Sequence, residues 1–320
     1  MRLSISGVYA ALATPIDATG RPDLDVFDQL INFVLERGVD GVVIGGGTGE
    51  YPHFDLDQRE TLARRAVEQV AGRGLVITCV GASSIFATLK LARSAADSGS
   101  DFLLLPAPHF FRYSQDDLAA YARAVCSAVP SPFLLYNLPS FAGPIKAPTA
   151  IRLIRTIPNL VGIKDSSGDR RNIELLAKVR EEPGCSVFVG DDSLLLDALQ
   201  AGWSGAVSGI GCFVPELIVA VYRAHQAGET EKASALQAML NDLIHEVVKL
   251  PIPWGVRAGL EARGTSCGPM HLPPSQRRLR QMDHLAAWLE SWAAERNLNL
   301  RSAWKSIPAQ TGVAAYGGDR

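Results

Sequence analysis

The sequence predicts an α/β fold, a closed (β/α)8 TIM barrel followed by a C-terminal helical extension. Its 320 residues exceed one ordinary small domain, but a single α/β barrel commonly reaches this length. Short apolar segments of strand length alternate with longer amphipathic segments up to about residue 228. Eight such pairs of segments are present, which is the number that closes a (β/α)8 barrel.

The strand candidates are nearly continuous in apolar residues, as expected for parallel strands that are covered on both faces. They occupy residues 8–15, 41–46, 75–82, 102–108, 132–139, 160–167, 186–192 and 205–211. A doubly wound open sheet is the alternative architecture. That fold would normally show a glycine-rich nucleotide fingerprint after the first strand, and the segment ATPIDATGRPD contains none.

The intervals between these strands have helical periodicity. In residues 24–38, Leu30, Phe33 and Val34 fall at helix spacing, and Gly38 is a suitable C-terminal stop. Residues 117–129 repeat the pattern with Leu118 and Val125. Each interval is therefore predicted to return the chain to the start of the next parallel strand.

The strand signals end near residue 228. Three helical segments follow at 229–250, 254–264 and 274–297, and prolines separate them. Residues 298–320 lack sustained periodicity. We therefore expect a barrel catalytic domain over 1–228, a three-helix extension over 229–297, and a flexible tail over 298–320.

Composition excludes several classes of partner. Lys+Arg 31 against Asp+Glu 33 gives a net charge of -2, so no basic excess exists to neutralise nucleic acid. No apolar run reaches the roughly 18 residues that a membrane span needs. The N-terminal apolar stretch is too short for a signal peptide and is broken at Thr14-Pro15. The expected location is the cytoplasm, without membrane or nucleic-acid partners.

The cysteines and histidines give no sign of a disulfide framework or a metal site. The five cysteines are widely separated and contain no C-x-x-C pair. They are Cys79, Cys126, Cys185, Cys212 and Cys267. Cys79 and Cys212 lie in apolar runs, where a buried, inert thiol is expected. The six histidines form no H-x-x-x-H or H-E-x-x-H arrangement, so we expect no metal site.

Four predicted strands end in unusual polar segments. Barrel enzymes place their reactive groups at the C-terminal ends of strands and in the loops that follow. The four segments are GGGTGE at 45–50, YNLP at 136–139, KDSSGD at 164–169 and GDDS at 190–193. They therefore mark the edge of the barrel where the chemistry is expected.

Lys164 is the first candidate for a catalytic residue. It alone among the seven lysines lies inside an apolar strand, after Leu-Val-Gly-Ile. A solvated lysine has a pKa near 10.4, and desolvation lowers that pKa, which makes the amine a usable nucleophile. An imine-forming lysine needs such a site. The alternative is a structural salt bridge between Lys164 and Asp165 or Asp169.

Tyr136 and the GGGTGE segment extend this candidate site. Tyr136 ends the preceding strand, about 4.8 Å away, and its phenol could serve as general acid and base. Its alternative role is a barrel-filling aromatic. The glycine-rich segment could bind a carboxylate through backbone N–H groups and the Thr48 hydroxyl, or could be only a tight turn. Glu50 is expected to be a structural carboxylate that ties loops together.

The four segments together resemble the dihydrodipicolinate synthase / N-acetylneuraminate lyase family of class I, pyruvate-type aldolases. The order and spacing match over roughly residues 7–295. The resemblance implies a (β/α)8 barrel, a homotetramer, and a lysine imine with pyruvate or another 2-oxo acid, without a cofactor. It makes Lys164 the imine lysine, Tyr136 the proton shuttle, and Thr48 with the Gly47 backbone the carboxylate clamp. It also turns the main-chain carbonyl of Val207 toward the site.

Three departures from the family's synthases concern the substrate. Those enzymes usually have two threonines where this chain has Gly47-Thr48. Their relay tyrosine falls on Phe110, and the arginine that holds the aldehyde's carboxylate falls on Phe141. Losing such polar partners reduces discrimination for that substrate. The sequence therefore favours a 2-keto-3-deoxy sugar acid or a hydroxy-oxoglutarate-type substrate, in aldol cleavage or dehydration. The alternative is 4-hydroxy-tetrahydrodipicolinate synthase, which condenses pyruvate with aspartate semialdehyde.

The remaining residues concern the outer part of the pocket. Asp192 and Ser193 are candidates to hold distal hydroxyls, and Phe110, Phe141 and His109 are expected to shape the pocket. His109 could instead be a loop residue that packs on aromatic rings. Two alternatives of other kinds are a non-catalytic 2-oxo acid sensor and a metal-dependent class II aldolase.

Overall fold

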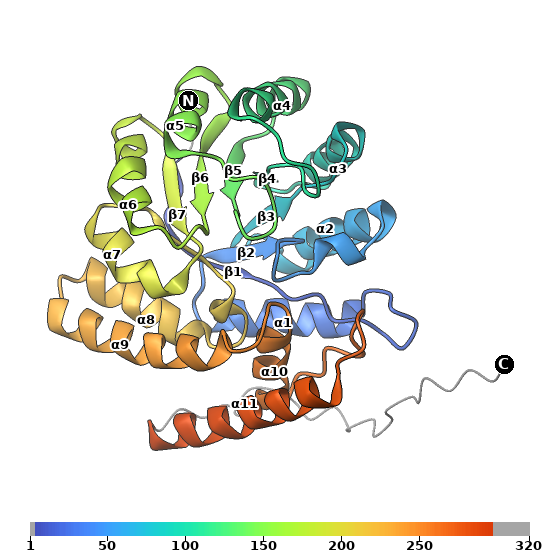
Figure 1. Cartoon of the computed structure of the whole chain (residues 1–320), viewed down its shortest axis with the longest axis vertical. Helices are drawn as coiled ribbons and strands as arrows, with labels where there is room; N and C mark the ends of the chain where they lie inside the picture. The colour runs from blue at the N-terminus through green and yellow to red at the C-terminus, as the bar shows by residue number, and fades with distance from the viewer. Residues whose placement is uncertain (1–3, 297–320) are drawn as a thin grey trace.

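A computed structural model describes residues 4–296 of the chain. Eight parallel strands close into a barrel in chain order, with β8 paired to β1 (Figure 1). The strands are β1 Gly7–Ala11, β2 Gly41–Ile44, β3 Leu75–Cys79, β4 Phe102–Pro106, β5 Phe133–Asn137, β6 Leu160–Asp165, β7 Ser186–Val189 and β8 Gly205–Ser208. The predicted fold class is confirmed.

Helices follow the strands and surround the barrel (Figure 1). They are α1 Leu24–Glu36, α2 Leu56–Val70, α3 Ile85–Asp97, α4 Gln115–Ala128, α5 Ala147–Thr156, α6 Arg170–Ala177, α7 Leu195–Gln200 and α8 Pro215–Gln226. Short 3-10 turns precede or extend several of them: η1 Tyr51–His53, η2 Lys178–Glu181, η3 Asp192–Leu194 and η4 Ile210–Cys212. Within residues 4–296, no helix has the length and apolar character needed to cross a membrane.

Each predicted strand segment coincides with a strand, although β1 begins one residue earlier, and every strand ends two to four residues before the predicted end. The reason is the sequence at the C-terminal edge. Gly45 leaves the β2 ladder in a left-handed conformation, with φ of 64°, and opens the loop that carries Thr48. The residues that the prediction counted as strand ends are thus the loops that build the mouth of the barrel.

Alternation along the strands produces two apolar layers. On β5, Leu134 and Tyr136 belong to the cluster inside the barrel, whereas Phe133 and Leu135 belong to the cluster between strands and helices. Successive side chains of a strand point to opposite faces, so one strand serves both layers. The polar residues Tyr136 and Lys164 therefore enter the barrel interior on the same side as its apolar filling.

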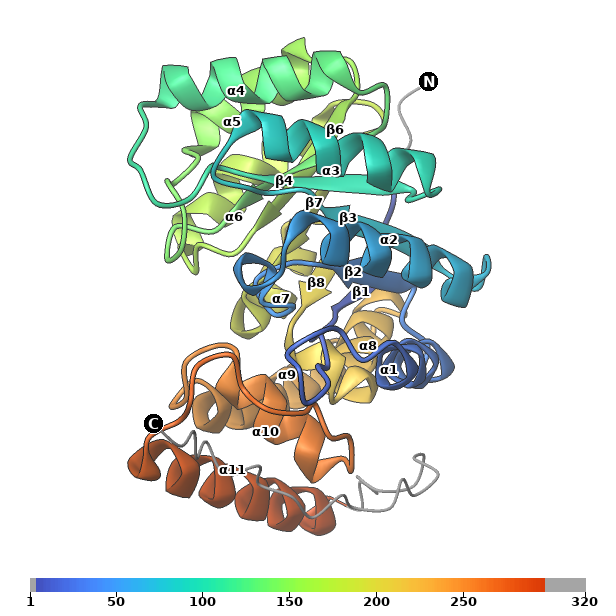
Figure 2. The same ribbon diagram turned by 90° about the vertical axis from the view of Figure 1, so that its right-hand side faces the viewer.

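Three helices follow the barrel: α9 Thr230–Val247, α10 Trp254–Ala262 and α11 Gln276–Glu295. Figure 2 shows them together beside one flank of the barrel, next to α8 and α1. Gln237 of α9 donates a hydrogen bond to the backbone carbonyl of Asp192 at 3.1 Å and accepts one from the Leu196 N–H. The extension thus supports the loop after β7. The tail predicted for 298–320 lies outside the described residues.

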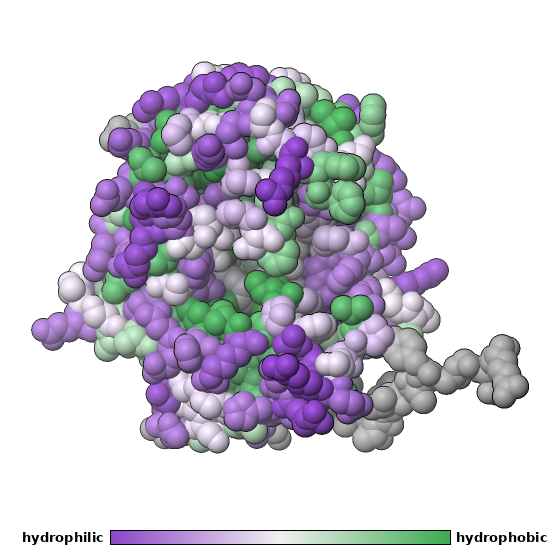
Figure 3. All heavy atoms as spheres, in the orientation of Figure 1, coloured by the Kyte–Doolittle hydropathy of each residue, from purple (hydrophilic) through white to green (hydrophobic). Residues whose placement is uncertain are grey.

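Burial of the cysteines agrees with the expectation for Cys79 and Cys212. All five cysteines are buried, and none of them forms a disulfide within the described residues. On the face shown in Figure 3, apolar residues are scattered among polar ones.

Candidate active site

Lys164 lies near the end of β6, and its side chain points into the mouth of the barrel. It is 4% exposed, and it is the only buried residue among the six lysines that the structure describes. Burial lowers the pKa of its amine to about 8, although Cys79 and Asp192 act in the opposite direction. At pH 7 about one Lys164 in ten is then a free amine, against about one in a few thousand for a solvated lysine.

The structure does not show the salt bridge that was the alternative role for Lys164. Asp165 accepts hydrogen bonds from Asn137 and from the Ser167 hydroxyl, the latter at 2.7 Å. Asp169 is paired with Arg171 at 2.7 Å. Among residues 4–296, no ion pair includes Lys164. The amine is therefore buried without a carboxylate at salt-bridge distance, and Asp192 acts on it only from farther away. This arrangement is more typical of reactive than of structural lysines.

Tyr136 lies directly beside this amine. The two residues are paired in the β5–β6 register, and the Lys164 Nζ lies 4.3 Å from the centroid of the Tyr136 ring. Tyr136 is 3% exposed, and burial raises the pKa of its phenol well above the usual value. The resting phenol is therefore neutral, while its phenolate would be a strong base.

The GGGTGE loop, which follows β2, lies next to Tyr136 at the mouth of the barrel. Thr48 is 8% exposed, and a side chain on Gly209 would meet its Oγ1 at 3.1 Å, so the hydroxyl faces the loop after β8. Gly47 faces Tyr136, because a Cβ there would lie 3.5 Å from the phenol oxygen. The loop is held from β1, since Thr14 donates a hydrogen bond to the Gly49 carbonyl at 3.0 Å. The loop of Gly47 and Thr48 therefore lies beside Tyr136.

Glu50 has the structural role that the sequence predicted. Its carboxylate accepts a hydrogen bond from the Arg257 guanidinium of α10 at 2.7 Å, and both side chains are almost completely buried. Arg257 also donates to the backbone carbonyls of Cys267 and Pro269. Glu50 has a left-handed backbone with φ of 55°, which costs a non-glycine residue about 1 kcal/mol. The ion pair thus fixes the loop of Thr48 to the C-terminal extension.

Replacing Arg257 with methionine is expected to lower the free energy of unfolding by about 3–5 kcal/mol, because it leaves the buried Glu50 carboxylate unpaired. Urea denaturation measures this change. The double variant Glu50→Gln with Arg257→Met is the matched control, and it should lose less than the sum of the two single changes. A loss below about 1 kcal/mol in R257M would contradict the structural role of the pair.

The segment after β7 brings Asp192 to the site but engages Ser193 elsewhere. Asp192 is 7% exposed; its Oδ2 accepts the Ile210 N–H at 3.3 Å, and its buried Oδ1 has no partner within residues 4–296. Burial raises the pKa of this carboxyl to about 7. The Ser193 hydroxyl donates to Asp191 at 2.7 Å and would have to leave it to bind a substrate hydroxyl. Val207 lies inside the barrel on β8.

The loops after β4 and β5 meet at the outer rim. His109 pairs with Ala142 in a short antiparallel bridge, which joins the two loops. Its Nδ1 lies 3.2 Å from the Tyr51 hydroxyl, and the two rings meet edge to face. This contact fits the alternative role of His109 as a loop residue packed on an aromatic ring. Phe110 and Phe141 are 86% and 57% exposed, so they line the rim rather than the interior.

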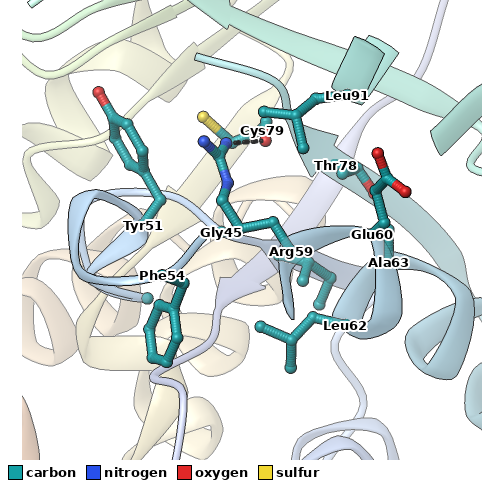
Figure 4. Close-up of a pocket in the computed structure, with 12 residues that line it drawn as sticks. Gly45, Tyr51, Phe54, Arg59, Glu60, Leu62, Ala63, Thr78, Cys79 and Leu91 are labelled. Atoms are coloured by element: carbon teal, nitrogen blue, oxygen red, sulfur yellow. Dashed lines mark hydrogen bonds between the residues drawn. The ribbon is translucent and has the colours of Figure 1, made fainter. Parts of the chain in front are cut away.

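Arg59 of α2 is a further buried residue near the strand ends, and nothing in its local sequence marks it. This buried guanidinium donates to the carbonyls of Cys79 and Gly81 at 2.9 and 2.7 Å, and it stacks over Tyr51. Figure 4 shows it between Tyr51 and the end of β3. The cavity beside it has a volume of about 10 Å³, room for about one water. Arg59 therefore supports the strand ends and does not open a second substrate site.

Nothing in the described part of the chain suggests a metal centre. Residues 4–296 contain no group of three His, Cys, Asp or Glu side chains placed to hold a metal ion.

Comparison with known proteins gives the same assignment over nearly the whole chain. Residues 4–290 match the dihydrodipicolinate synthetase family. The 4-hydroxy-tetrahydrodipicolinate synthase of Nitrosospira multiformis is 36% identical over 269 residues, which cover 82% of this chain and 89% of that protein. The synthase of the same name from Exiguobacterium sp. is 33% identical, over 84% of this chain and 91% of its own length.

Solved structures agree in fold. A prophage protein of the dihydrodipicolinic acid synthase family from E. coli K12, in complex with pyruvate, is 25% identical with a TM-score of 0.83 and covers 90% of this chain and 98% of its own. Dihydrodipicolinate synthase from Aquifex aeolicus is 26% identical with a TM-score of 0.85, covering 93% and 100%. Enzymes of this family form an imine between a lysine and pyruvate and use no external cofactor. The chain belongs to the dihydrodipicolinate synthetase family and is an enzyme of the lyase class.

Proposed function

We propose that Lys164 forms an imine with pyruvate or a related 2-oxo acid, and that Tyr136 moves the protons of the reaction. The observation that carries this proposal is the buried Lys164 amine, which has no carboxylate partner and lies 4.3 Å from the Tyr136 ring. A desolvated amine beside a buried phenol supplies both the nucleophile and the acid–base group of such a reaction.

The first step is imine formation. The substrate carboxylate binds the Thr48 hydroxyl and the N–H groups of Gly47 and Thr48, which places the C2 carbonyl next to Lys164. The neutral amine attacks C2, and the resulting carbinolamine loses water to give a protonated imine. Because the imine nitrogen is positively charged, it accepts the electron pair that is released at C3.

The second step is proton transfer through Tyr136. When the carbinolamine loses water, the Tyr136 phenol gives its proton to the departing hydroxyl and becomes a phenolate. This phenolate then takes a proton from C3, which gives the enamine, or from a C4 hydroxyl, which breaks the C3–C4 bond. Burial supports both roles, because a phenol with a raised pKa is a strong base once it is deprotonated. A non-catalytic sensor of 2-oxo acids would need neither group.

The first candidate for the second substrate is aspartate semialdehyde, in a condensation with pyruvate. The names of the relatives at 31–36% identity support this reaction. They favour it over the sugar-acid substrate that the sequence analysis preferred.

A second candidate, a 2-keto-3-deoxy sugar acid or a hydroxy-oxoglutarate-type acid, follows from the rim of the site. Phe141 and Phe110 are apolar and exposed where the resemblance expects an arginine and a tyrosine. Asp192, with a buried and unpartnered Oδ1, is a suitable acceptor for a distal hydroxyl. These residues favour the sugar acid, whose far end carries hydroxyls, over aspartate semialdehyde and the hydroxy-oxoglutarate-type acid, whose far ends carry a carboxylate.

The experiment is a panel of second substrates. The enzyme is incubated with pyruvate and aspartate semialdehyde, and separately with 2-keto-3-deoxy acids and 4-hydroxy-2-oxoglutarate, and the change in pyruvate is measured with and without EDTA. Turnover of any 2-oxo acid supports the imine proposal, and the preferred partner identifies the substrate. Pyruvate binding without turnover of any member would favour the sensor, and loss of turnover in EDTA would favour a metal-dependent aldolase.

Imine formation is expected to depend on pH through Lys164. Its amine has a pKa of about 8 and attacks only when it is deprotonated. The rate constant for pyruvate should therefore rise about tenfold per pH unit below pH 8 and level off above about pH 9. Stopped-flow or quenched trapping over pH 6–10 measures this profile. A midpoint near 10.5, the value of a solvated lysine, would contradict the desolvated site.

The homotetramer that the resemblance implies is also a proposal. The exposed Phe110, Phe111 and Phe141 give it an apolar surface to cover. Light scattering of the purified enzyme measures its mass in solution, and a monomer would contradict the proposal.

A further inference from the structure

Ser166 lies two residues after Lys164, at the point where β6 ends, and its hydroxyl has no fixed partner. Its Oγ is buried and has no hydrogen-bond partner among the described residues. A buried hydroxyl without a partner lowers the stability of the folded protein, so such a group in an enzyme site indicates a functional role. The neighbouring Ser167 differs, because its hydroxyl donates to Asp165 and accepts from Asp169 and Asn172.

The space around Ser166 is kept open by Gly190 at the end of β7. A Cβ on Gly190 would lie 2.0 Å from the Ser166 Oγ and 2.6 Å from the Lys164 Cε. The absence of a side chain there lets the Ser166 hydroxyl and the end of the Lys164 chain lie side by side. Ser166 is thus packed into the site and not directed to solvent.

Ser166 lies beside Tyr136 in the barrel mouth. Its backbone N–H donates to the carbonyl of Asn137, the residue after Tyr136, at 2.9 Å, and its side chain lies next to that of Lys164, whose amine lies over the Tyr136 ring. Burial and nearby Cys79 raise the pKa of the Tyr136 phenol, and the Ser166 hydroxyl and the Gly47 N–H lower it. Tyr51 also raises it. The Thr48 hydroxyl faces Gly209, and Gly47 has no side chain.

We infer that Ser166 is a positioning residue for the proton transfer, whose hydroxyl donates a hydrogen bond to the Tyr136 phenolate. This inference rests on the proposed function of Tyr136. When the phenol gives its proton to the substrate, a negative charge forms in a buried place. The Ser166 O–H and the Gly47 N–H then donate to the phenolate oxygen, and the proton returns to that oxygen in the reverse step.

The test measures two reactions of pyruvate without a second substrate. Borohydride trapping reports the imine on Lys164, and NMR in D2O reports exchange of the C3 protons, which needs Tyr136. In Ser166→Ala, trapping at saturating pyruvate should match the wild type, while C3 exchange should fall about 10- to 100-fold, the range for a hydrogen bond to a charged group. Ser166→Cys keeps the size but donates weakly, so its exchange rate should lie between the two.

Ser167→Ala is the matched control in the same loop. It removes three hydrogen bonds and should lower the melting temperature more than S166A does, while its exchange rate stays within about threefold of the wild type. Wild-type exchange in S166A would overturn the inference. So would a parallel loss of trapping and exchange, the pattern of a damaged site. If the wild type itself traps no pyruvate on Lys164, the proposed function fails and the inference falls with it.

Discussion

Replacing Lys164 with arginine is expected to lower kcat/KM for pyruvate by at least about 10⁴-fold. Arginine keeps the positive charge and much of the length, but its guanidinium is always protonated and forms no imine. Steady-state turnover of the preferred substrate measures the loss. Lys232→Arg, which changes an exposed lysine of α9, should retain wild-type activity.

A second variant at this position separates function from stability. Lys164→Met removes a buried ammonium that has no carboxylate partner, so the free energy of unfolding should rise by about 1–3 kcal/mol while activity is lost. Chemical denaturation measures this gain. A K164M protein that is inactive and also strongly destabilised would show that the lysine holds the barrel together, which contradicts its assignment as a reactive group.

Replacing Tyr136 with phenylalanine is expected to lower kcat by about 10²- to 10⁴-fold, with a smaller change in KM for pyruvate. The ring still packs beneath the Lys164 amine, so the change removes only the proton-carrying oxygen. Imine trapping and turnover, measured on the same protein, separate binding from proton transfer.

Tyr121→Phe provides the control for losing a buried phenol. The Tyr121 hydroxyl is hydrogen-bonded to Thr88 at 2.9 Å, between α4 and α3, and the ring packs on the apolar cluster between strands and helices, outside the barrel interior. Its removal should change kcat less than about threefold. A Y136F enzyme that keeps more than about one fifth of wild-type kcat would leave Tyr136 as a barrel-filling aromatic.

The sequence predicted the barrel because the period of its apolar segments follows directly from burial on both faces of a parallel sheet. It also located Lys164 and Tyr136, since a charged or phenolic residue at the end of an apolar run is conspicuous. The ends of strands were predicted less well. Gly45 looks like a strand continuation by composition, but its left-handed backbone turns the chain into a loop.

Contacts between distant segments could not be predicted in the same way. Glu50 was expected to tie loops together, but its partner Arg257 lies 207 positions away on α10, and nothing local marks that pairing. In the sequence, Arg59 looks like any polar residue of an amphipathic helix. Only the folded structure shows that it donates to the Cys79 carbonyl at the end of β3. Ser166 is one of two adjacent serines, and only the geometry separates their roles.

The most direct test of the central claim is borohydride reduction of the enzyme in the presence of pyruvate, followed by peptide mass spectrometry. We expect one stable pyruvate adduct, on the peptide that contains Lys164, in the wild type and none in K164R. An adduct on any other lysine, or no adduct while the enzyme still turns over a 2-oxo acid, would contradict the claim.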